Sequence, residues 1–472
     1  MTSSIQLSKQ PSKTERKIST RNVKKTSFYI YDFPETNWYQ ACKETFPLKY
    51  QKTVKPRNEP PNHLYTHGND IIFLERLFYH PWRVSNPDEA DILILPFLFN
   101  YFLEHHDGSK KDIRCHGQGL QEGEKLNFDQ LLSLSENFLV KNSNPSFLKN
   151  SKPHLIFFSH WYLTVNNIQK IFQDHTIFIE RILPKVHLAV YETQNRRFYW
   201  RGGIRFDQTK KGISLGKILT PNKPSWRASV VVPYTEWPIL SFEFLDELLT
   251  FERWKNLPID LFFVGRIHHP SYKTRKNVCQ TLKKSVLINR STNFTYICAE
   301  THGGVHSGTA YSGKTKKHWS DCKFDSCHNR LRCSACHFTE ELSTYYQEFM
   351  LNTKFQLIIH GDTASTSRLY DALTNGQIPI IISPGLYSVG LPFSDKIPWN
   401  DLAFFVPYTA WDSGSYLEIF ETCLLQILGS SEEILRFKFE NLLRYRKDIS
   451  WLDPESSIIE NILDDAREYR KI

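Results

Sequence analysis

The chain has 472 residues, of which 40% are hydrophobic and 14% aromatic. This apolar content is enough for two hydrophobic cores, and a single core in a chain of this length would be unusual. The formal net charge of +9 at pH 7 would suit a nucleic-acid partner, but its distribution along the chain argues against one.

The N-terminal 27 residues hold most of the positive charge. Seven lysine and arginine residues stand there against Glu15 alone, a net charge of +6, which leaves +3 for residues 28–472. We find no RNA- or DNA-binding motif in the chain. We therefore interpret residues 1–27 as a disordered basic tail and expect no nucleic-acid partner. No apolar run reaches the ~18 residues of a membrane span, and the N-terminus lacks the apolar core of a signal peptide.

Helical and strand-like segments alternate along the rest of the chain, which predicts an α/β fold with two domains. A first domain is expected at 28–250 and a second at 258–430. The boundary is placed where an acidic helical stretch, Phe242–Trp254, precedes Asn256-Leu257-Pro258. The final segment, 431–472, has a helical pattern with one polar face.

Two arginines follow the first strand of the second domain. Arg266 comes directly after the apolar run Leu261–Gly265, and Arg275 opens the next helical segment. Open α/β sheets bind ligands past the carboxyl ends of their strands. Both arginines are therefore candidates for an anion site.

A cysteine cluster interrupts the second domain. Cys322, Cys327, Cys333 and Cys336 are closely spaced, with three histidines nearby. Disulfides, a structural zinc and unpaired thiols all fit the composition, and the spacing matches no standard zinc finger. Two glycosylation sequons lie just upstream, at Asn289 and Asn293. Beside clustered cysteines, they favour the secretory lumen.

The most informative stretch is 355–406. An apolar strand (Phe355–Ile359) leads into a loop of small hydroxyl residues, a helix from Arg368 and a second strand, Ile378–Ile382. Such a loop offers backbone N–H groups at a helix start, where the helix dipole also favours phosphate. Arg368 adds a cation, and Asp371 lies one turn later, where it can accept from a ribose hydroxyl. This unit predicts a site for a nucleoside diphosphate.

The same stretch resembles the donor-binding signature of the exostosin family of glycosyltransferases. The matching residues are Gly361-Asp362-Thr363, Arg368-Leu369-Tyr370-Asp371-Ala372, Gly376, Ile378-Pro379-Ile380-Ile381, Leu391-Pro392-Phe393 and Trp399. Thr366 replaces a usual serine, and His360 stands where the family usually has arginine. Four upstream segments are also similar to the family, in the expected order: Phe28–Pro34, Glu75–Pro96, Val230–Tyr234 and Leu261–Gly265.

The resemblance implies a GT-B fold, with two Rossmann-like domains facing each other across a cleft. The second domain would bind a nucleotide sugar, UDP-linked, and the first a glycan acceptor, with inversion at the transferred sugar. The donor-binding residues implied are Arg266, Arg275, His360, Gly361, Asp362, Ser365, Thr366, Arg368 and Asp371. The chain contains no Asp-x-Asp, so we expect the leaving diphosphate to be stabilised by cations and a helix N-terminus without a metal or other cofactor.

Three residues are candidates for the general base that inversion requires. His160 follows the strand-like run Leu155–Ser159, where the family often shows His-Asp; here Trp161 replaces the aspartate. Asp32 follows the first strand, and Glu236 lies near the predicted boundary between the domains.

A non-catalytic function is the alternative interpretation. The chain would then keep the family's fold and serve as a partner subunit of a related glycosyltransferase. A dinucleotide enzyme is disfavoured, because no Gly-x-Gly-x-x-Gly follows a strand. The resemblance also implies the Golgi or endomembrane lumen, although the chain shows neither a signal peptide nor a membrane anchor.

Overall fold

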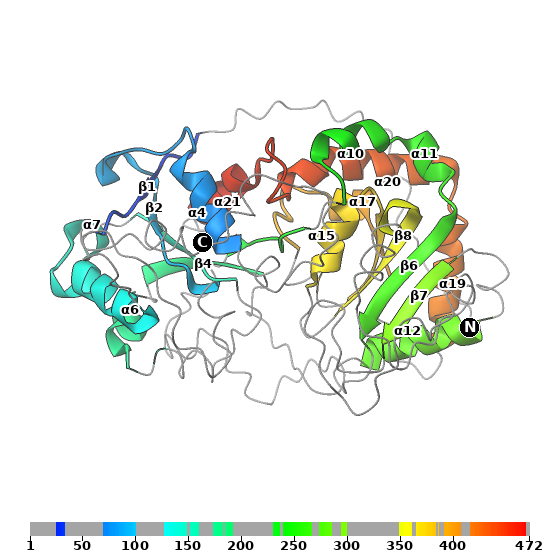
Figure 1. Cartoon of the computed structure of the whole chain (residues 1–472), viewed down its shortest axis with the longest axis horizontal. Helices are drawn as coiled ribbons and strands as arrows, with labels where there is room; N and C mark the ends of the chain where they lie inside the picture. The colour runs from blue at the N-terminus through cyan, green and yellow to red at the C-terminus, as the bar shows by residue number, and fades with distance from the viewer. Residues whose placement is uncertain are drawn as a thin grey trace.

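The structure of the chain is a computed structural model. It describes residues 25–33, 69–100, 127–148, 152–159, 172, 174–182, 185–191, 230–236, 239–266, 273–285, 294–299, 349–360, 365–383, 386, 391–406 and 416–468. The described strands form two five-stranded sheets, one in each half of the molecule (Figure 1).

The first sheet is parallel and follows the order of the chain, β1-β2-β3-β4-β5. Its strands are β1 (Phe28–Ile30), β2 (Ile92–Leu95), β3 (His154–Phe157), β4 (Val186–Val190) and β5 (Val230–Val231). Every residue of β2 and β3 is buried. This is why both read as apolar runs without alternation, as is usual for parallel strands covered on both faces.

Helices cover both faces of the first sheet. The helical segments here are α4 (Asn69–Phe78), η1 (Pro87–Glu89), α6 (Phe128–Glu136), η2 (Asn137–Lys141), α7 (Pro145–Leu148) and η3 (Phe178–Ile182). The ring of Phe73 on α4 lies 4.8 Å from that of Phe157, and Phe147 on α7 lies 5.0 Å from His154. Residues 154 and 157 are three apart on β3, so their side chains point to opposite faces.

The second sheet is also parallel, but its order is β10-β9-β8-β6-β7. Its strands are β6 (Ile259–Arg266), β7 (Phe294–Ala299), β8 (Thr353–Ile359), β9 (Ile378–Ile382) and β10 (Phe404–Phe405). The short β10 pairs only with Ile380 and Ile381 of β9. Pro379 therefore stands where β9 has no β10 partner, a position that tolerates the missing N–H.

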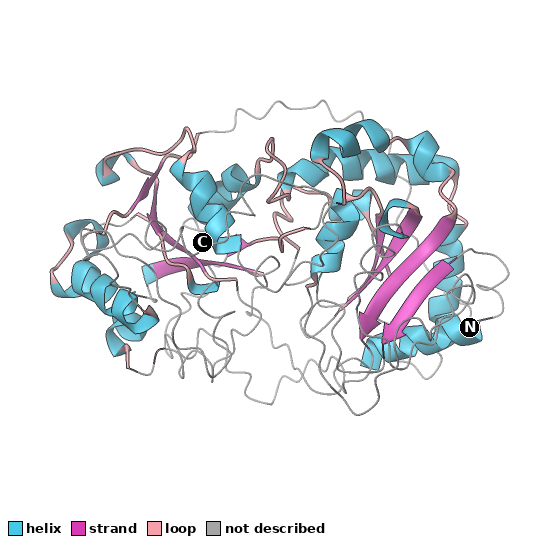
Figure 2. Ribbon diagram, in the orientation of Figure 1, coloured by secondary structure: helices cyan, strands magenta, loops and turns pink. Residues whose placement is uncertain are grey.

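Seven helices belong to the described part of this half (Figure 2). They are α10 (Phe242–Leu248), α11 (Phe251–Lys255), α12 (Lys273–Lys284), α15 (Ser367–Thr374), α17 (Trp399–Leu402), α19 (Tyr416–Leu428) and α20 (Glu432–Tyr445). The α11 helix comes before the second sheet in sequence, yet it packs on β8 and on α20, and α10 lies beside α20 in Figure 1. The aromatic ring of Trp254 on α11, for example, lies 5.4 Å from that of Phe355 on β8.

The turn after α15 depends on Gly376. Its φ is +76°, and a Cβ there would lie 2.4 Å from Leu249 Cδ2. Glycine alone therefore fits without strain or displacement of that leucine. The α15 helix accordingly ends at Thr374, with Asn375 as its C-cap.

The C-terminal segment serves both halves. The α20 helix packs on α17 and α11 of the second half, the chain passes through η9 (Arg446–Asp448), and α21 (Ile458–Glu468) packs on α4, β2 and β5. Figure 1 shows α21, in red, beside the blue α4.

The predicted fold class, α/β with two Rossmann-like, parallel-sheet halves in the GT-B manner, is confirmed. Among the residues that the structure describes, no helix combines the length and apolar character needed to cross a membrane.

Candidate functional site

The candidate site lies at the carboxyl edge of the second sheet, between β6 and β8. The chain leaves β6 toward β7 on one side and later places β8 on the other side. The connections after β6 and β8 therefore diverge, and such a reversal of strand order is where open α/β sheets bind ligands. Arg266 is the last residue of β6, and His360 directly follows β8. Arg266 thus lies one position earlier than predicted relative to its strand, at the same edge.

The first turn of α12 is fixed to the end of β8. Arg275 is buried, with 5% of its surface exposed, and its Nε donates to the carbonyl oxygen of His360 at 3.0 Å. His360 Nε2 and Thr274 Oγ1 share a hydrogen bond of 2.8 Å. The histidine that replaces the family's arginine is therefore held by Thr274, and its carbonyl positions Arg275.

The first turn of α15 forms the other side. Thr366 is the N-cap residue with an extended backbone, but its side chain makes no capping bond to the helix. Its Oγ1 instead accepts from Arg368 Nη1 at 3.3 Å. Arg368 is only 6% exposed, and Ser365 and Asp371 are also buried. A buried guanidinium at a helix start favours a bound anion, because both carry positive charge at the same end.

The structure places the described donor residues in two groups on one side of the second sheet. Arg275 and His360 are bonded at the ends of β6 and β8. Ser365, Thr366, Arg368 and Asp371 lie at or just before α15, which packs on β8. Gly361 and Asp362 lie outside the described residues, as does the side chain of Arg266. Their assignments stay predictions.

A polar network at the carboxyl edge of the first sheet escaped the sequence analysis. Asn100 Nδ2 donates to Asn69 Oδ1 at 3.0 Å and to Ser159 Oγ at 2.7 Å, and Asn100 Oδ1 accepts from the Ser159 N–H at 3.0 Å. Tyr191 OH also donates to Asn69 Oδ1, at 3.0 Å. One signal was present: Asn100 follows the apolar run of β2 and Phe97–Phe99, where a buried amide is unexpected. Nothing local marks Asn69.

The network fixes the backbone that leads into His160. His160 itself, one of the three predicted bases, lies outside the described residues. Ser159 immediately before it is buried and bonded through both its N–H and its hydroxyl.

The other two predicted bases lie at opposite edges of the first sheet. Asp32 is exposed and follows the edge strand β1, whereas Glu236 follows the other edge strand, β5. Four strand spacings separate these edges, or about 19 Å. Asp32 and Glu236 therefore cannot serve the same acceptor hydroxyl.

Glu236 is 1% exposed, and its carboxylate binds the C-terminal segment. Oε2 accepts from the N–H of Trp451 at 2.9 Å, and Oε1 accepts from the N–H of Leu452 at 2.7 Å and from the hydroxyl of Ser450. Burial raises the pKa of the Glu236 carboxyl, and these bonds oppose the rise. Its role as a base stays a prediction.

Aromatic rings connect the two halves beside this residue. Tyr234 stacks on Tyr191 with the ring centroids 3.6 Å apart, and the ring of Tyr370 on α15 lies 6.2 Å from Tyr234. The β5 edge of the first sheet is therefore the edge nearest to α15.

The predicted cysteine cluster at Cys322, Cys327, Cys333 and Cys336 also lies outside the described residues. Disulfides, zinc and unpaired thiols remain the three alternatives for these four residues.

Comparison with known proteins identifies the part of the chain that forms this site. Residues 268–415 match the model of the Exostosin GT47 domain, a range that contains α12, β8 and α15. The probable glucuronosyltransferase GUT1 of Oryza sativa subsp. japonica is 40% identical over 68 residues, which are 14% of this chain and 15% of that relative. The chain thus spans only a small part of the relative that it matches.

Two solved structures align over most of their length but only loosely. An alpha-glucosyltransferase in complex with UDP-glucose and DNA containing an abasic site has a TM-score of 0.34 and 10% identity, covering 90% of this chain and 95% of its own. A putative UDP-N-acetylglucosamine 2-epimerase from Listeria monocytogenes has a TM-score of 0.30 and 9% identity, with coverages of 89% and 91%. Likenesses this weak carry no argument about function.

The motifs at 355–406 lie within the matched domain, and its helices α12 and α15 build the site between β6 and β8. Residues 268–415 of the chain are therefore similar to the Exostosin GT47 domain.

Proposed function

We propose that the chain is an inverting glycosyltransferase that moves a sugar from a UDP-linked donor to a glycan acceptor without a metal ion. One observation carries the proposal. Arg275 and Arg368, both buried, meet the starts of two helices at the strand-order reversal of the GT47 domain. This arrangement suits a ligand with two adjacent negative phosphates.

The donor half handles the leaving group. As the bond between the anomeric carbon and the diphosphate oxygen breaks, the electron pair stays on the diphosphate. Arg275 and Arg368 are held in place by His360 and Thr366, so little reorganisation is needed as that charge develops. Cations preorganised in this way can do the work that a metal ion does in other transferases, and the chain has no Asp-x-Asp.

The acceptor half supplies the base, for which we favour His160. The base takes the proton of the acceptor hydroxyl as its oxygen attacks the anomeric carbon. The Asn100–Ser159 bonds hold the residue before His160. Asp32 lies at the edge of the first sheet away from α15, and the carboxylate of Glu236 already accepts three hydrogen bonds.

A second function, that of a non-catalytic partner subunit, is favoured by two residues. His360 replaces an arginine of the family and is engaged with Thr274, and Trp161 replaces the aspartate after His160. Either function fits the Golgi or endomembrane lumen, which we propose from the family alone.

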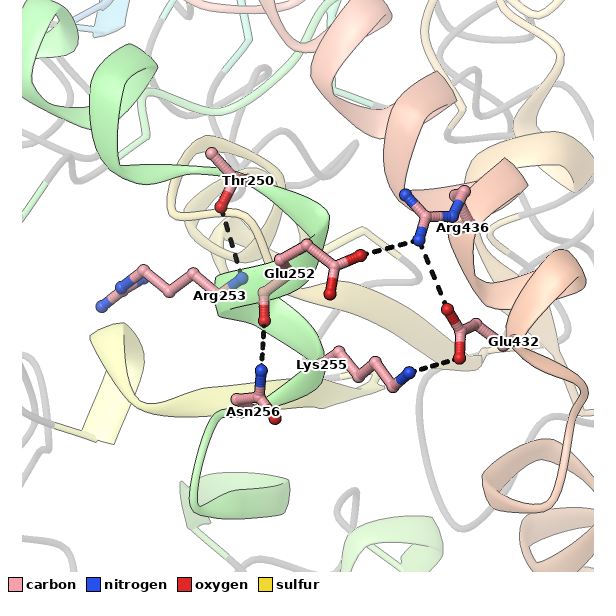
Figure 3. A network of polar contacts seen from close by, with 7 residues as sticks. All are labelled: Thr250, Glu252, Arg253, Lys255, Asn256, Glu432 and Arg436. Atoms are coloured by element: carbon pink, nitrogen blue, oxygen red, sulfur yellow. Dashed lines mark hydrogen bonds and ion pairs between the residues drawn. The ribbon is translucent and has the colours of Figure 1, made fainter.

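The test begins with UDP binding by calorimetry. Arg368→Ala should weaken UDP binding by about 10²-fold or more, because a charge-assisted contact worth a few kcal/mol is lost. Arg436→Ala is the matched control, since the side chain of this arginine is 41% exposed on α20. Figure 3 shows its ion pairs with Glu252 and Glu432. Equal UDP affinity in all three proteins would contradict the site.

Transfer is then measured with a panel of nucleotide sugars and glycan acceptors, with and without EDTA. Full activity in EDTA is expected, and a loss that Mn²⁺ restores would contradict the metal-free step. His160→Ala should lower turnover by roughly 10²–10⁴-fold with UDP affinity unchanged. A wild-type chain that binds UDP but transfers to no acceptor, alone or with a co-expressed relative, is the partner subunit.

A further inference from the structure

In the described part of the chain, two segments cross between the halves, and these crossings meet at one buried point. The first lies between β5 and α10 and is described at residues 232–236 and 239–241, and the second runs from α20 to α21 through residues 446–457. Glu236 lies on the first crossing, and its three hydrogen-bond donors, Ser450, Trp451 and Leu452, lie on the second. We call these two segments and their contacts the junction.

Trp451 anchors the second crossing to the first half. It is completely buried, its ring lies 5.5 Å from Phe157 of β3 and 6.4 Å from Phe73 of α4, and its Nε1 donates to the carbonyl oxygen of Pro233 at 2.8 Å. Arg76 of α4 donates to the carbonyl oxygen of Asp453 nearby. Burial lowers the pKa of Arg76, and the charge of Glu236 opposes this shift.

The end of α15 anchors both crossings to the second half. The N–H of Ile239, on the first crossing, donates to Asn375 Oδ1 at 3.0 Å. Arg446, which starts the second crossing, donates from Nη1 to the carbonyl oxygen of Thr374 at 3.2 Å and pairs with Asp246 of α10. Asn375 also bonds back to the carbonyl oxygen of Asp371 at 2.8 Å.

The helix that carries the donor site therefore ends in the junction. The α15 helix has eight residues, so only about 12 Å separates its two ends. Arg368 lies in its first turn, and Thr374 and Asn375 lie at its last. A shift of the junction would move the donor site relative to the first half.

We propose that Glu236 is a positioning residue. Its carboxylate joins the two crossings and so holds the donor helix α15 in register with the acceptor half. The proposal concerns transfer only through the proposed function, because the geometry of a bound donor and acceptor depends on this register. The three hydrogen bonds that the Glu236 carboxylate accepts suit this positioning role, whereas a general base needs an oxygen that can take up a proton.

The test compares Glu236→Gln with Ser450→Ala. The glutamine keeps the shape but places an amide NH₂ against one of the three donors, and the alanine removes one donor while leaving the carboxylate. In both variants the amides of Trp451 and Leu452 should exchange hydrogen at least about tenfold faster, since a bond to a charged group is weakened. Glu252→Gln is the matched control, because this glutamate of α11 is 68% exposed and pairs only with a surface arginine, Arg436, among the described residues.

Activity assays separate positioning from base chemistry. Both variants should lose transfer, by up to about 10²-fold, with UDP affinity unchanged and the pH–rate profile keeping its shape. A general base would behave otherwise: Glu236→Gln would remove the acidic limb of that profile, while Ser450→Ala would stay near wild type. That pattern, or wild-type exchange in both variants, would overturn the proposal.

Failure of the proposed function gives a different result. A wild-type chain without UDP binding or transfer contradicts the glycosyltransferase, while hydrogen exchange at residues 450–453 still tests the junction. If Glu236→Gln does not fold, Ser450→Ala carries the test by itself.

Discussion

At the scale of single residues, His154 shows how burial in the core of the first half changes the pKa of a titratable group. It is buried in β3, its Nε2 shares a hydrogen bond of 2.9 Å with Tyr31 OH, and the two rings stack 5.8 Å apart. Burial lowers the pKa of His154 to about 4. The imidazole is therefore neutral in the folded chain at pH values where the unfolded chain is already protonated.

This difference predicts a loss of stability in acid. As the pH falls from about 6.5 to 4, His154 is protonated in the unfolded state but stays neutral in the folded state. Its contribution to the free energy of unfolding therefore falls by about 3 kcal/mol. Urea unfolding at pH 7 and pH 5 should show about 2 kcal/mol of this loss. His154→Phe should show a smaller loss between these values, although it is less stable at pH 7 because Tyr31 OH loses its partner. An equal loss in both proteins would assign the pH dependence to other groups.

The residues of the donor site were more accessible to prediction than those of the acceptor edge. Arg275 and Arg368 lie just past apolar strands, so their position at the sheet edge follows from the local sequence. The bond between Thr274 and His360 joins residues 86 positions apart, and it depends on β6 and β8 being neighbours. No local sequence pattern predicts this hydrogen bond. The bond between Ser159 and Asn69, which are 90 positions apart, could not be predicted for the same reason.

At the scale of elements, the buried strands and α15 were predicted well, and helix breaks were not. The predicted helical stretch Phe242–Trp254 is two helices, because Ser241 and Thr250 each accept from the N–H three residues later and so start a helix of their own. Figure 3 shows the Thr250 cap. The apolar run from Val230 contributes only two residues to β5.

The packing of α20 on α17 predicts a further result at this scale. Lys438 Nζ donates to the carbonyl oxygens of Asn400, at 2.6 Å, and Ala403, at 2.8 Å, and lies 4.4 Å from the centroid of the Phe404 ring. These carbonyls belong to the end of a four-residue helix, where no helical donor reaches them. Lys438→Met keeps most of the packing but leaves both carbonyls without their donor. The free energy of unfolding should therefore fall by about 2–3 kcal/mol.

Lys255→Met is the control for Lys438→Met. Lys255 is 46% exposed and pairs with Glu432 on the surface, so its loss should change stability by less than about 1 kcal/mol. Urea unfolding of both variants gives the comparison. Equal effects would mean that the carbonyls of Asn400 and Ala403 find water in place of Lys438.

At the scale of the whole molecule, the order of the strands lay beyond the residue pattern, and analogy with GT-B glycosyltransferases alone suggested that the C-terminal helix returns to the first half. Apolar runs specify that strands exist, but not that β6 lies between β7 and β8 or that α21 packs beside α4. Both are settled by contacts between segments far apart in the chain, such as Thr26 Oγ1 with Asp464 Oδ1 at 2.8 Å.

This shared segment predicts that the two halves unfold together. Ile462 of α21 is fully buried, on a helix that packs against α4, β2 and β5. Ile462→Ala should destabilise the first half by about 2–5 kcal/mol, and Glu468→Ala at the exposed end of the same helix is the control. Hydrogen exchange is followed in peptides that contain β3 and β8. Because Trp451, Glu236 and the end of α15 join the halves through buried contacts, both peptides should lose protection in parallel. Loss confined to β3 would show that the second half unfolds independently and that the junction does not couple the two.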